Sequence, residues 1–453
     1  MYRLNKIVKI SLLCVIILSL IACAEKPSDN QQDNNLKVLL SKAGVSANQF
    51  QVSYSDAKVE LGRLLFFDKI LSGNRDIACA TCHHPLLKTV DTLPLSMGTG
   101  HQGLGPTRAF NPSRTLIPRN SPELFNRGHP IWQTLFWDGR ISGNVSMGFT
   151  TPAGNQTPVG LENILAAQAL FPVTSQDEMR GRPGDLDVFA QLNEVANIPD
   201  ENFIGIWESL YQRVWVIPAY QNLLRQAYPG TADQQFSFVH LANAIAEFEI
   251  ASFTSLNSRF DRYLVGQSDA LSNNEIAGAQ LFYGKAKCAD CHTGLLQTDQ
   301  AFYNLGVPQL GPGKDIVQSL DFGRFIETAV AEDKYCFRTP SLRNVALTGP
   351  YMHNGAYSDL RMALLHHLNA ISMLQNFNVN DLVEPFASSV KNNLATQQDI
   401  LNSLDDYALN PPQLSDREID LIVDFMHSLT DPAALDLQHT IPTSVPSGLA
   451  VFD

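Results

Sequence analysis

The sequence predicts an all-α fold built from two related units, and three observations support this prediction. The chain has 453 residues, which at roughly 100–200 residues per domain suggests two or three domains with cores of their own. A helical pattern followed by Cys-x-x-Cys-His occurs twice, at positions more than 200 residues apart. No strand-rich or Rossmann-like segment stands out in the chain.

The composition excludes several classes of protein. Hydrophobic residues make up 44% and charged residues 17% of the chain, so it is neither a disordered protein nor a multi-span membrane protein. Its 32 Lys and Arg against 45 Asp and Glu give a net charge of −13, whereas a nucleic-acid-binding protein normally has a basic face. The negative charge either attracts basic soluble partners or simply keeps the chain soluble.

Residues 1–22 have the pattern of a bacterial lipoprotein signal peptide. Three basic residues precede an apolar run over residues 10–22, which is shorter than the ~20 residues that a membrane-spanning helix needs. The run ends in Leu-Ile-Ala-Cys, which resembles a lipobox and makes Cys23 the lipidated first residue of the mature chain. The polar residues 24–35 then form a flexible tether. We therefore expect a periplasmic protein that a lipid anchor alone attaches to the membrane.

Two pentapeptides are typical of c-type haem attachment sites. In such a site two thiols form thioether bonds to the haem vinyl groups, and the adjacent His supplies a nitrogen to iron. Chance would give roughly 0.003 such motifs at this composition. A Cys₄ zinc site would need its two cysteine pairs about 15–20 residues apart, and a redox dithiol needs no His after the pair. The two motifs, which predict two covalently bound c-type haems, are Cys79-Ala80-Thr81-Cys82-His83 and Cys288-Ala289-Asp290-Cys291-His292.

The sequence before each motif repeats as well. Leu64-Leu65-Phe66-Phe67 precedes the first motif, and Leu281-Phe282-Tyr283 precedes the second, each within a helical pattern. Ser272 and Glu275 form a capping box that opens the helix before the second motif. Two copies of a helix leading to a haem motif predict two cytochrome-c-like units, which need haem to complete their cores.

The expected domain organisation follows from these units. A further capping box, Ser415 with Glu418, opens the last clear helix of the chain. The expected segments are a tether and lead-in at 23–50, a first haem domain at 51–240, a second haem domain at 241–430, and a C-terminal segment at 431–453 that wraps back over the body, with long loops between the helices.

Ordered sequence blocks through nearly all of the mature chain resemble the bacterial di-haem cytochrome c peroxidase/MauG family. The resemblance implies an all-helical protein with two haem domains and a calcium ion between them. It also implies that the N-terminal haem is the peroxide site. The matching blocks are Leu61–Asp68, Arg119–Pro122, Phe136–Arg140, Asp177–Met179, Asn257–Tyr263, Arg338–Asn344 and Leu347–Gly355.

The resemblance assigns an acid/base to the first haem. Glu178 matches the family glutamate that acts in O–O cleavage, and Gln168 and Pro172 keep the family spacing ahead of it. Heterolysis needs a proton moved from one peroxide oxygen to the other, which a carboxylate near the haem can relay. Taken alone, a glutamate on a polar loop is a solvated surface charge.

Four further residues match positions between the haems. Trp137 matches the tryptophan that carries electrons or holes, and the same residue can also be an ordinary core aromatic. Asn120, Thr348 and Pro350 match the residues that bind calcium, the last two through backbone carbonyl groups. Oxygen-only ligation suits Ca²⁺.

The expected distal ligand of the second haem differs in residue type from that of the known family members. The position of the family's Met or Tyr falls on His367, counted without gaps from Leu347. Leu360, Ala363 and Leu364 share one helical face with His367, which favours burial of the imidazole. His366 is the substitute ligand, and a core histidine without iron is the remaining alternative. Two His ligands would give a lower potential than His and Met.

The first haem has a different distal candidate. Thr99 occupies the position of the distal His found in peroxidases with an inactive resting state, and His101 lies two residues beyond it. Either His101 ligates the first iron or that iron is open or water-bound, and we favour the open iron. Insertions at 104–117 and 142–161 either build a docking or channel surface or are variable loops. The remaining thiol, Cys336, is expected to be a buried small apolar residue.

Three functions are compatible with these features. We favour an enzyme that reduces hydrogen peroxide with electrons from a small cytochrome c or cupredoxin, which enter at the second haem. The first alternative is a MauG-type enzyme that oxidises Trp or Tyr residues of a partner protein. The second is a non-catalytic electron-transfer cytochrome, in which both irons are six-coordinate.

Overall fold

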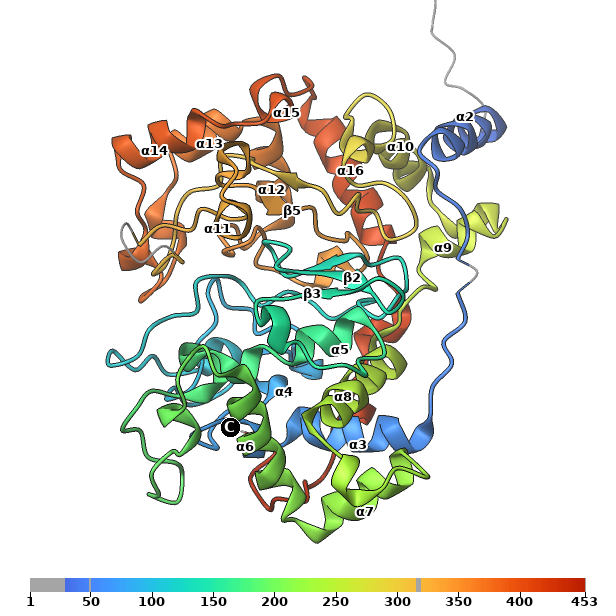
Figure 1. Cartoon of the computed structure of the whole chain (residues 1–453). Helices are drawn as coiled ribbons and strands as arrows, with labels where there is room; N and C mark the ends of the chain where they lie inside the picture. The colour runs from blue at the N-terminus through green and yellow to red at the C-terminus, as the bar shows by residue number, and fades with distance from the viewer. Residues whose placement is uncertain (1–28, 49, 315–318, 453) are drawn as a thin grey trace, which may run out of the picture.

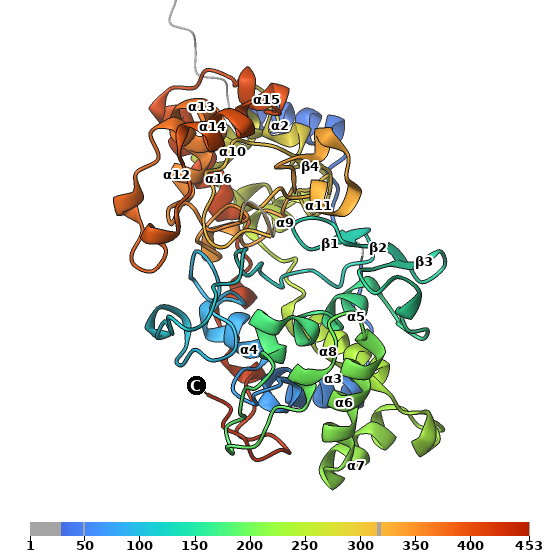
Figure 2. The same cartoon turned by 60° about the vertical axis from the view of Figure 1, so that its left-hand side comes forward.

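The computed structural model describes residues 29–48, 50–314 and 319–452. The expected signal peptide and Cys23 lie outside these residues. Figure 1 shows a largely helical molecule in two halves, one above the other, and Figure 2 shows the same separation after a 60° turn. Within the described part of the chain, no helix has the length and apolar character needed to cross a membrane.

The lower half of Figure 1 has its core between two helices, α3 (Asp56–Phe67) and α8 (Phe238–Phe253). Leu61 and Leu65 lie one turn apart on α3 and are fully buried, as an amphipathic helix requires. A Cβ atom on Gly62 would lie 1.8 Å from the carbonyl oxygen of Ala244, so glycine is needed for this close approach. This half is completed by α4 (Cys79–Cys82), α5 (Ile164–Ala169), α6 (Phe203–Trp215) and α7 (Pro218–Ala227).

The upper half repeats this arrangement with α10 (Asn273–Phe282) and α16 (Asp416–Ser428). The predicted capping boxes at Ser272 and Ser415 open these two helices, which confirms both helix starts. Gly278 has the same role as Gly62, because a Cβ atom on it would lie 1.9 Å from the carbonyl oxygen of Leu421. The other helices here are α9 (Arg259–Leu264), α11 (Phe325–Thr328), α12 (Leu360–Leu368), α13 (Ala370–Gln375), α14 (Leu394–Leu401) and α15 (Asp406–Leu409).

Two expected boundaries differ from the structure. Helix α8 continues through residue 240, and Phe253 at its end packs in the lower core. The change between the halves therefore lies after Phe253, because one continuous helix belongs to the lower core. In the segment expected to be a flexible tether and lead-in, α2 (Asp29–Lys42) packs against α10. Leu36 and Leu40, one turn apart, bury in the upper core and explain why this polar segment is helical.

Two small sheets join the helical elements. The first is an antiparallel meander, and its β2–β3 hairpin is the start of the insertion at 142–161, with Val145 and Met147 exposed near the tip. The all-α prediction therefore holds for the main elements, and the strands are confined to connections. The strands of the two sheets are β1 (Thr134–Leu135), β2 (Ile141–Asn144) and β3 (Gly148–Thr150), then β4 (Phe302–Tyr303) paired antiparallel with β5 (Phe337–Arg338).

The C-terminal segment after α16 returns to the lower half. Ala434 and Leu437 pack in the lower core. The buried carboxylate of Asp68, at the end of α3, accepts hydrogen bonds from Tyr220 Oη and Ser447 Oγ, both at 2.6 Å. These bonds attach the last residues of the chain to the helix that precedes the first Cys-x-x-Cys-His motif.

Candidate functional site

Each half contains a cavity lined by one Cys-x-x-Cys-His motif. The first cavity, in the lower half, has a volume of about 690 Å³, and the second cavity, in the upper half, has about 300 Å³. Both volumes fall in the range of ~300–1,000 Å³ that is usual for cofactor sites. Among the described residues that line them, Trp137 alone is common to both cavities.

A single helical turn presents the first motif to the first cavity. In α4 the backbone N–H of His83 donates to the carbonyl of Cys79 at 3.0 Å, which places both thiols and the imidazole on the cavity wall. His83 Nδ1 donates to the carbonyl of Thr89 at 3.2 Å, so Nε2 is the ring nitrogen left for iron. Burial lowers the pKa of His83 to about 4, so the ring is neutral, as a metal ligand must be.

The second motif has the same internal geometry. The backbone N–H of His292 donates to the carbonyl of Cys288 at 2.8 Å, and its Nδ1 donates to the carbonyl of Gln297 at 3.1 Å. Burial lowers the pKa of His292 to about 4. Both motif histidines therefore use a backbone carbonyl a few residues onward to fix the same ring nitrogen.

Burial favours the protonated form of three motif thiols. Burial raises the pKa of Cys79 and Cys288 to about 12 and that of Cys291 to about 11. A zinc or redox site would favour thiolates instead. Within the described residues there is also no group of three or more His, Cys, Asp or Glu placed to hold a metal ion. Neutral thiols beside an available imidazole nitrogen fit thioether attachment of haem.

His367 and His292 both line the second cavity, with their ring centroids 6.5 Å apart. His367 Nδ1 donates to the carbonyl of Ala363, one turn back on α12, at 2.8 Å, which leaves Nε2 available. Two metal–imidazole bonds of ~2 Å and two ring radii of ~1.2 Å would place the centroids about 6.4 Å apart. The observed separation therefore fits one iron between the two rings.

His366, the substitute ligand, lies elsewhere. Its Nδ1 is 2.8 Å from Tyr357 Oη and its Nε2 is 2.8 Å from the carbonyl of Leu305, so both ring nitrogens are engaged. It is fully buried and does not line the second cavity.

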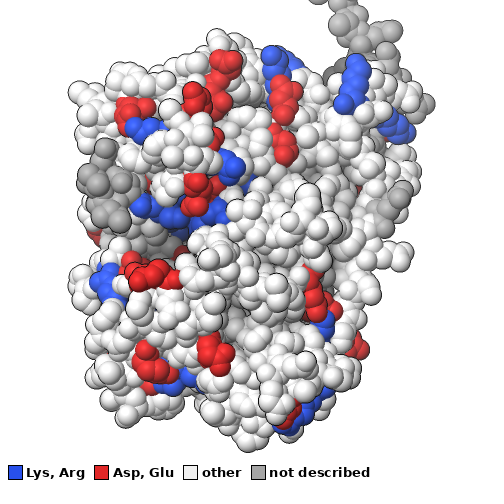
Figure 3. All heavy atoms as spheres, viewed as in Figure 1, with Lys and Arg blue, Asp and Glu red and all other residues white. Residues whose placement is uncertain are grey.

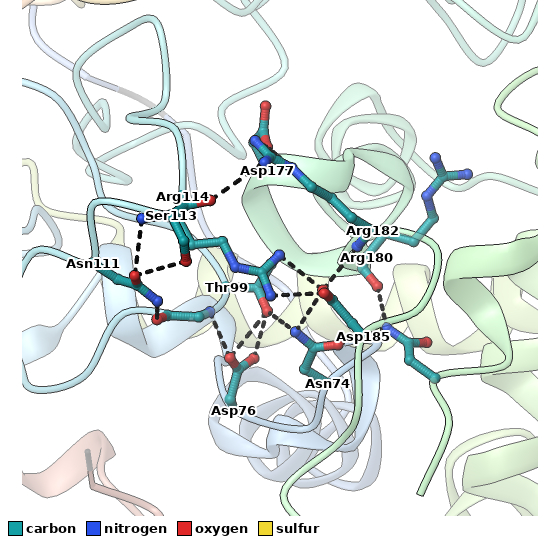
Figure 4. Close-up of polar contacts among 12 residues, drawn as sticks. Asn74, Asp76, Thr99, Asn111, Ser113, Arg114, Asp177, Arg180, Arg182 and Asp185 are labelled. Carbon is teal, nitrogen blue, oxygen red and sulfur yellow. Dashed lines mark hydrogen bonds and ion pairs between the residues drawn. The ribbon is translucent and has the colours of Figure 1, made fainter. Parts of the chain in front are cut away.

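His101 and Thr99 do not line the first cavity. His101 Nδ1 donates to the carbonyl of Gly98 at 3.1 Å, and its ring packs on Phe110. Figure 4 shows Thr99 held by the Asp76 carboxylate, at 2.8 and 3.0 Å from its Oγ1. The structure therefore keeps the distal candidate of the first haem away from that cavity.

Glu178 lies on a single π-helical turn, Gln176–Arg180, and lines the first cavity together with Gln168 and Pro172. Its backbone is fixed on both sides, since its N–H donates to Ser175 Oγ at 3.3 Å and its carbonyl accepts from the Thr99 N–H at 2.9 Å. The loop that carries Thr99 is itself fixed by the hydrogen bonds and ion pairs drawn in Figure 4. Burial raises the pKa of Glu178 despite nearby cations.

Trp137 lies between the cavities, and its Nε1 donates to the carbonyl of Asn120 at 3.0 Å. The N–H of Asn120 in turn donates to the carbonyl of His353 at 2.8 Å. Asn120 thus lies beside the segment that carries Thr348 and Pro350, the other two residues matched to calcium binding. These two line neither cavity.

Comparison with known proteins decides the family. The family model described as di-haem cytochrome c peroxidase matches residues 56–269. The chain is 31% identical to the methylamine utilization protein MauG of Methylorubrum extorquens, over 69% of this chain and 68% of that protein. It is 32% identical to the cytochrome c551 peroxidase of Pseudomonas aeruginosa, over 68% of this chain and 71% of that protein. The chain belongs to the di-haem cytochrome c peroxidase/MauG family.

Solved structures support the fold of this di-haem peroxidase. A MauG-like protein associated with microbial copper homeostasis aligns with a TM-score of 0.58 at 22% identity, over 86% of this chain and 94% of that one. The diheme peroxidase BthA of Burkholderia thailandensis aligns with a TM-score of 0.54 at 20% identity, over 88% and 91% of the two chains. Family membership makes the protein an oxidoreductase with two c-type haems.

The di-haem peroxidase also has a charged group that the sequence did not reveal. Arg140 and Lys314 line the first cavity, and both contact the buried carboxylate of Asp138. Figure 3 shows Lys and Arg side chains gathered at a hollow between the two halves. Arg140 belongs to a block matched to the family, whereas no local pattern singles out Lys314.

A second missed residue is Glu249 on α8, which lines the first cavity. It is buried, its Oε2 has no hydrogen-bond partner among the described residues, and burial raises its pKa to about 8. The signal for it was present in the sequence, because Glu249 is a carboxylate within a mostly apolar helical segment, directly between Phe248 and Ile250.

Proposed function

We propose that this di-haem peroxidase reduces hydrogen peroxide to water in the periplasm, at a haem attached to the first motif. Each peroxide takes up two electrons and two protons and gives two water molecules. One observation carries the proposal: the first cavity gathers Glu178, Gln168 and Pro172 around the first Cys-x-x-Cys-His motif. When bound there, the haem supplies the iron at which peroxide is reduced.

In this proposal Glu178 moves the proton. Its carboxylate accepts a proton from one peroxide oxygen and returns it to the other, which leaves as water. Because burial raises its pKa, Glu178 takes up this proton more readily than an exposed glutamate does. The Gln168 amide offers hydrogen bonds to peroxide in the same cavity, and the fixed φ of Pro172 stabilises the turn that leads to Glu178.

Electrons enter at the second motif in this proposal, where His292 and His367 would hold the haem iron. A small cytochrome c or cupredoxin supplies them one at a time. Trp137 carries them onward, and its position on the walls of both cavities supports this role. His101 has no ligand role in the proposal, because it does not line the first cavity.

Calcium and the lipid anchor are also part of the proposal. Asn120, Thr348 and Pro350 offer oxygen atoms that suit Ca²⁺, and the bond from Asn120 to the carbonyl of His353 supports their proximity. The anchor at Cys23 is supported by the sequence pattern of residues 1–22.

A second candidate function is oxidation of Trp or Tyr residues in a partner protein. The 31% identity to a methylamine utilization protein MauG favours it. A non-catalytic electron-transfer cytochrome is disfavoured, because that function needs two six-coordinate irons and His101 lies outside the first cavity.

The test is peroxide turnover by the purified holoprotein with a reduced small cytochrome c, combined with electron paramagnetic resonance. We expect peroxide-dependent oxidation of the cytochrome and one high-spin haem signal. Negligible cytochrome turnover together with peroxide-dependent oxidation of a protein partner would favour the second candidate. A spectrum with no high-spin haem signal, even after one-electron reduction, would contradict both enzymes.

A further inference from the structure

Two cations that line the first cavity have no role in the proposed reaction. Arg140 Nη1 lies 2.9 Å and Lys314 Nζ lies 3.1 Å from the same atom, Asp138 Oδ2. The Asp138 side chain is fully buried, whereas those of Arg140 and Lys314 are partly open. One buried carboxylate therefore holds two cations from different halves of the molecule at the wall of one cavity.

The positive and negative charges around Asp138 do not balance. Arg119 lies behind Asp138, with Nη1 2.5 Å from its Oδ2, and it also makes a bidentate contact with Asp321 at 2.6 and 2.8 Å. Arg119, Arg140 and Lys314 are thus three cations around two buried carboxylates. One positive charge is left without a partner within the group.

Of the other described acids that line the cavity, Asp177 and Asp200 pair with Arg182 and Arg180, which leaves Glu178 and Glu327 near the cations of this group. Glu178 and Glu327 line the same cavity, and burial raises the pKa of both carboxyl groups even though cations lie near them. Lys314 shows the effect of the surplus positive charge. Burial together with repulsion from Arg140 and Arg119 lowers the pKa of Lys314 to about 8. A bound anion would relieve this repulsion and stabilise the ammonium form.

We infer that Arg140 and Lys314 bind the propionate carboxylates of the first haem, with Asp138 as their positioning residue. The inference rests on the first haem of the proposed function and is independent of the peroxide reaction. The propionates are the carboxylates that thioether attachment through Cys79 and Cys82 leaves free.

The geometry of Arg140 suits this ligand. Its guanidinium lies over the ring of Phe136, 3.6 Å from the centroid, and Asp138 engages it through Nη1. The stacked plane and the single anchored nitrogen fix the side chain while its other N–H groups are available to a carboxylate. Lys314 adds a point charge with further donors.

A small carboxylate from solution has the same chemistry as a propionate. Such an anion would have to reach Arg140 and Lys314 from solvent. A site filled by the haem's own propionates does not respond to added carboxylate, whereas an open site does. This difference separates the two sources of the anion.

The experiment is a spectroelectrochemical titration of the first haem in holoprotein carrying Arg140→Gln or Lys314→Gln. Loss of a cation beside the propionates disfavours the reduced, more negative haem. We expect the Fe(II)/Fe(III) ratio at a fixed potential to fall about tenfold, which corresponds to ~59 mV for a one-electron couple. Arg140→Lys keeps the charge and should restore most of the ratio. Lys334→Gln, which removes a cation paired with Asp399 outside both cavities, is the matched control and should leave the ratio unchanged.

An unchanged ratio in both Gln variants would overturn the inference. So would a saturable shift of the wild-type haem spectrum on addition of acetate that Arg140→Gln abolishes, because it would mean that an external anion occupies the site. Peroxide turnover is measured separately on the wild type. Its absence would contradict the proposed function, whereas a tenfold fall in the ratio would still support the propionate contact.

Discussion

The imidazole rings of His292 and His367 line one cavity with their centroids 6.5 Å apart. Each ring donates its Nδ1 hydrogen to a backbone carbonyl, that of Gln297 for His292 and that of Ala363 for His367. Both Nε2 atoms are therefore left for a shared metal, and the backbone bonds fix both tautomers. A haem at the second motif would receive two protein ligands and leave no position open to peroxide, which suits electron transfer.

The first prediction concerns this pair. His367→Ala removes the second axial ligand, so the second haem should change from low spin to high spin while its thioether attachment stays intact. Electron paramagnetic resonance of the oxidised holoprotein measures the change. His366→Gln is the control and should stay low spin, since His366 is engaged by Tyr357 and Leu305. A second haem that stays low spin in His367→Ala would contradict the assignment of His367 as its ligand.

The second prediction concerns the acid/base. Glu178→Gln keeps the shape of the side chain but cannot relay a proton, so kcat for peroxide should fall ~10²–10⁴-fold. Steady-state turnover with reduced cytochrome measures this, with the haem absorption spectrum as the check on folding. Glu194→Gln, which changes a carboxylate paired with Arg213 outside the first cavity, is the control. Equal activity of the two variants would refute the role of Glu178.

The third prediction concerns pH. Glu178 must be ionised to accept the peroxide proton, so kcat/KM should fall as pH drops through the pKa of Glu178. Burial raises that pKa, so the fall should be centred above the ~4.3 of an ordinary glutamate. The measurement is a pH profile of kcat/KM for the wild type and Glu178→Gln. The profile of Glu178→Gln should lack this fall in kcat/KM at low pH. If the fall persists in the variant, a group other than Glu178 causes it.

The fourth prediction concerns Trp137. Trp137→Phe removes the indole that lines both cavities, so electron transfer from the second haem to the first should slow at least about tenfold. Stopped-flow absorption after rapid reduction of the second haem measures the rate. Trp215→Phe on α6 is the matched control, because Trp215 lines neither cavity. Equal rates in the two variants would show that electrons do not need Trp137.

Local patterns predicted much of this molecule. The capping boxes at Ser272 and Ser415 are local, because the side chains that satisfy the first backbone N–H groups lie within one turn. The two haem motifs are local for the same reason, since one turn of chain carries both thiols and the ligand. His367 was found by counting from the family-matched block at Leu347, with support from its helical face, and it does line the second cavity.

The long-range contacts could not be predicted from the sequence. Lys314 reaches Asp138 across 176 residues, and no pattern around either residue encodes that pairing. Helix α2 reads as a polar tether, but Leu36 and Leu40 are buried in the upper core, where α2 packs against α10. His101 looked close enough in sequence to reach the first haem, yet contacts with Gly98 and Phe110 hold it outside the cavity.

The fifth prediction concerns Glu249 and stability. Burial raises the pKa of this carboxyl to about 8 in the folded protein, against ~4.3 when the chain is unfolded. The folded state therefore favours the protonated form, and the free energy of unfolding declines as pH rises from about 4.3 to about 8. The loss at pH 8 is at most about 5 kcal/mol. Glu249→Gln cannot ionise, so its Tm should exceed that of the wild type at pH 8 by clearly more than at pH 5. Thermal unfolding of the holoprotein at both pH values measures this, with Glu247→Gln on the same helix as the control. Equal Tm values at pH 8 would mean that Glu249 finds a partner in the loaded cavity.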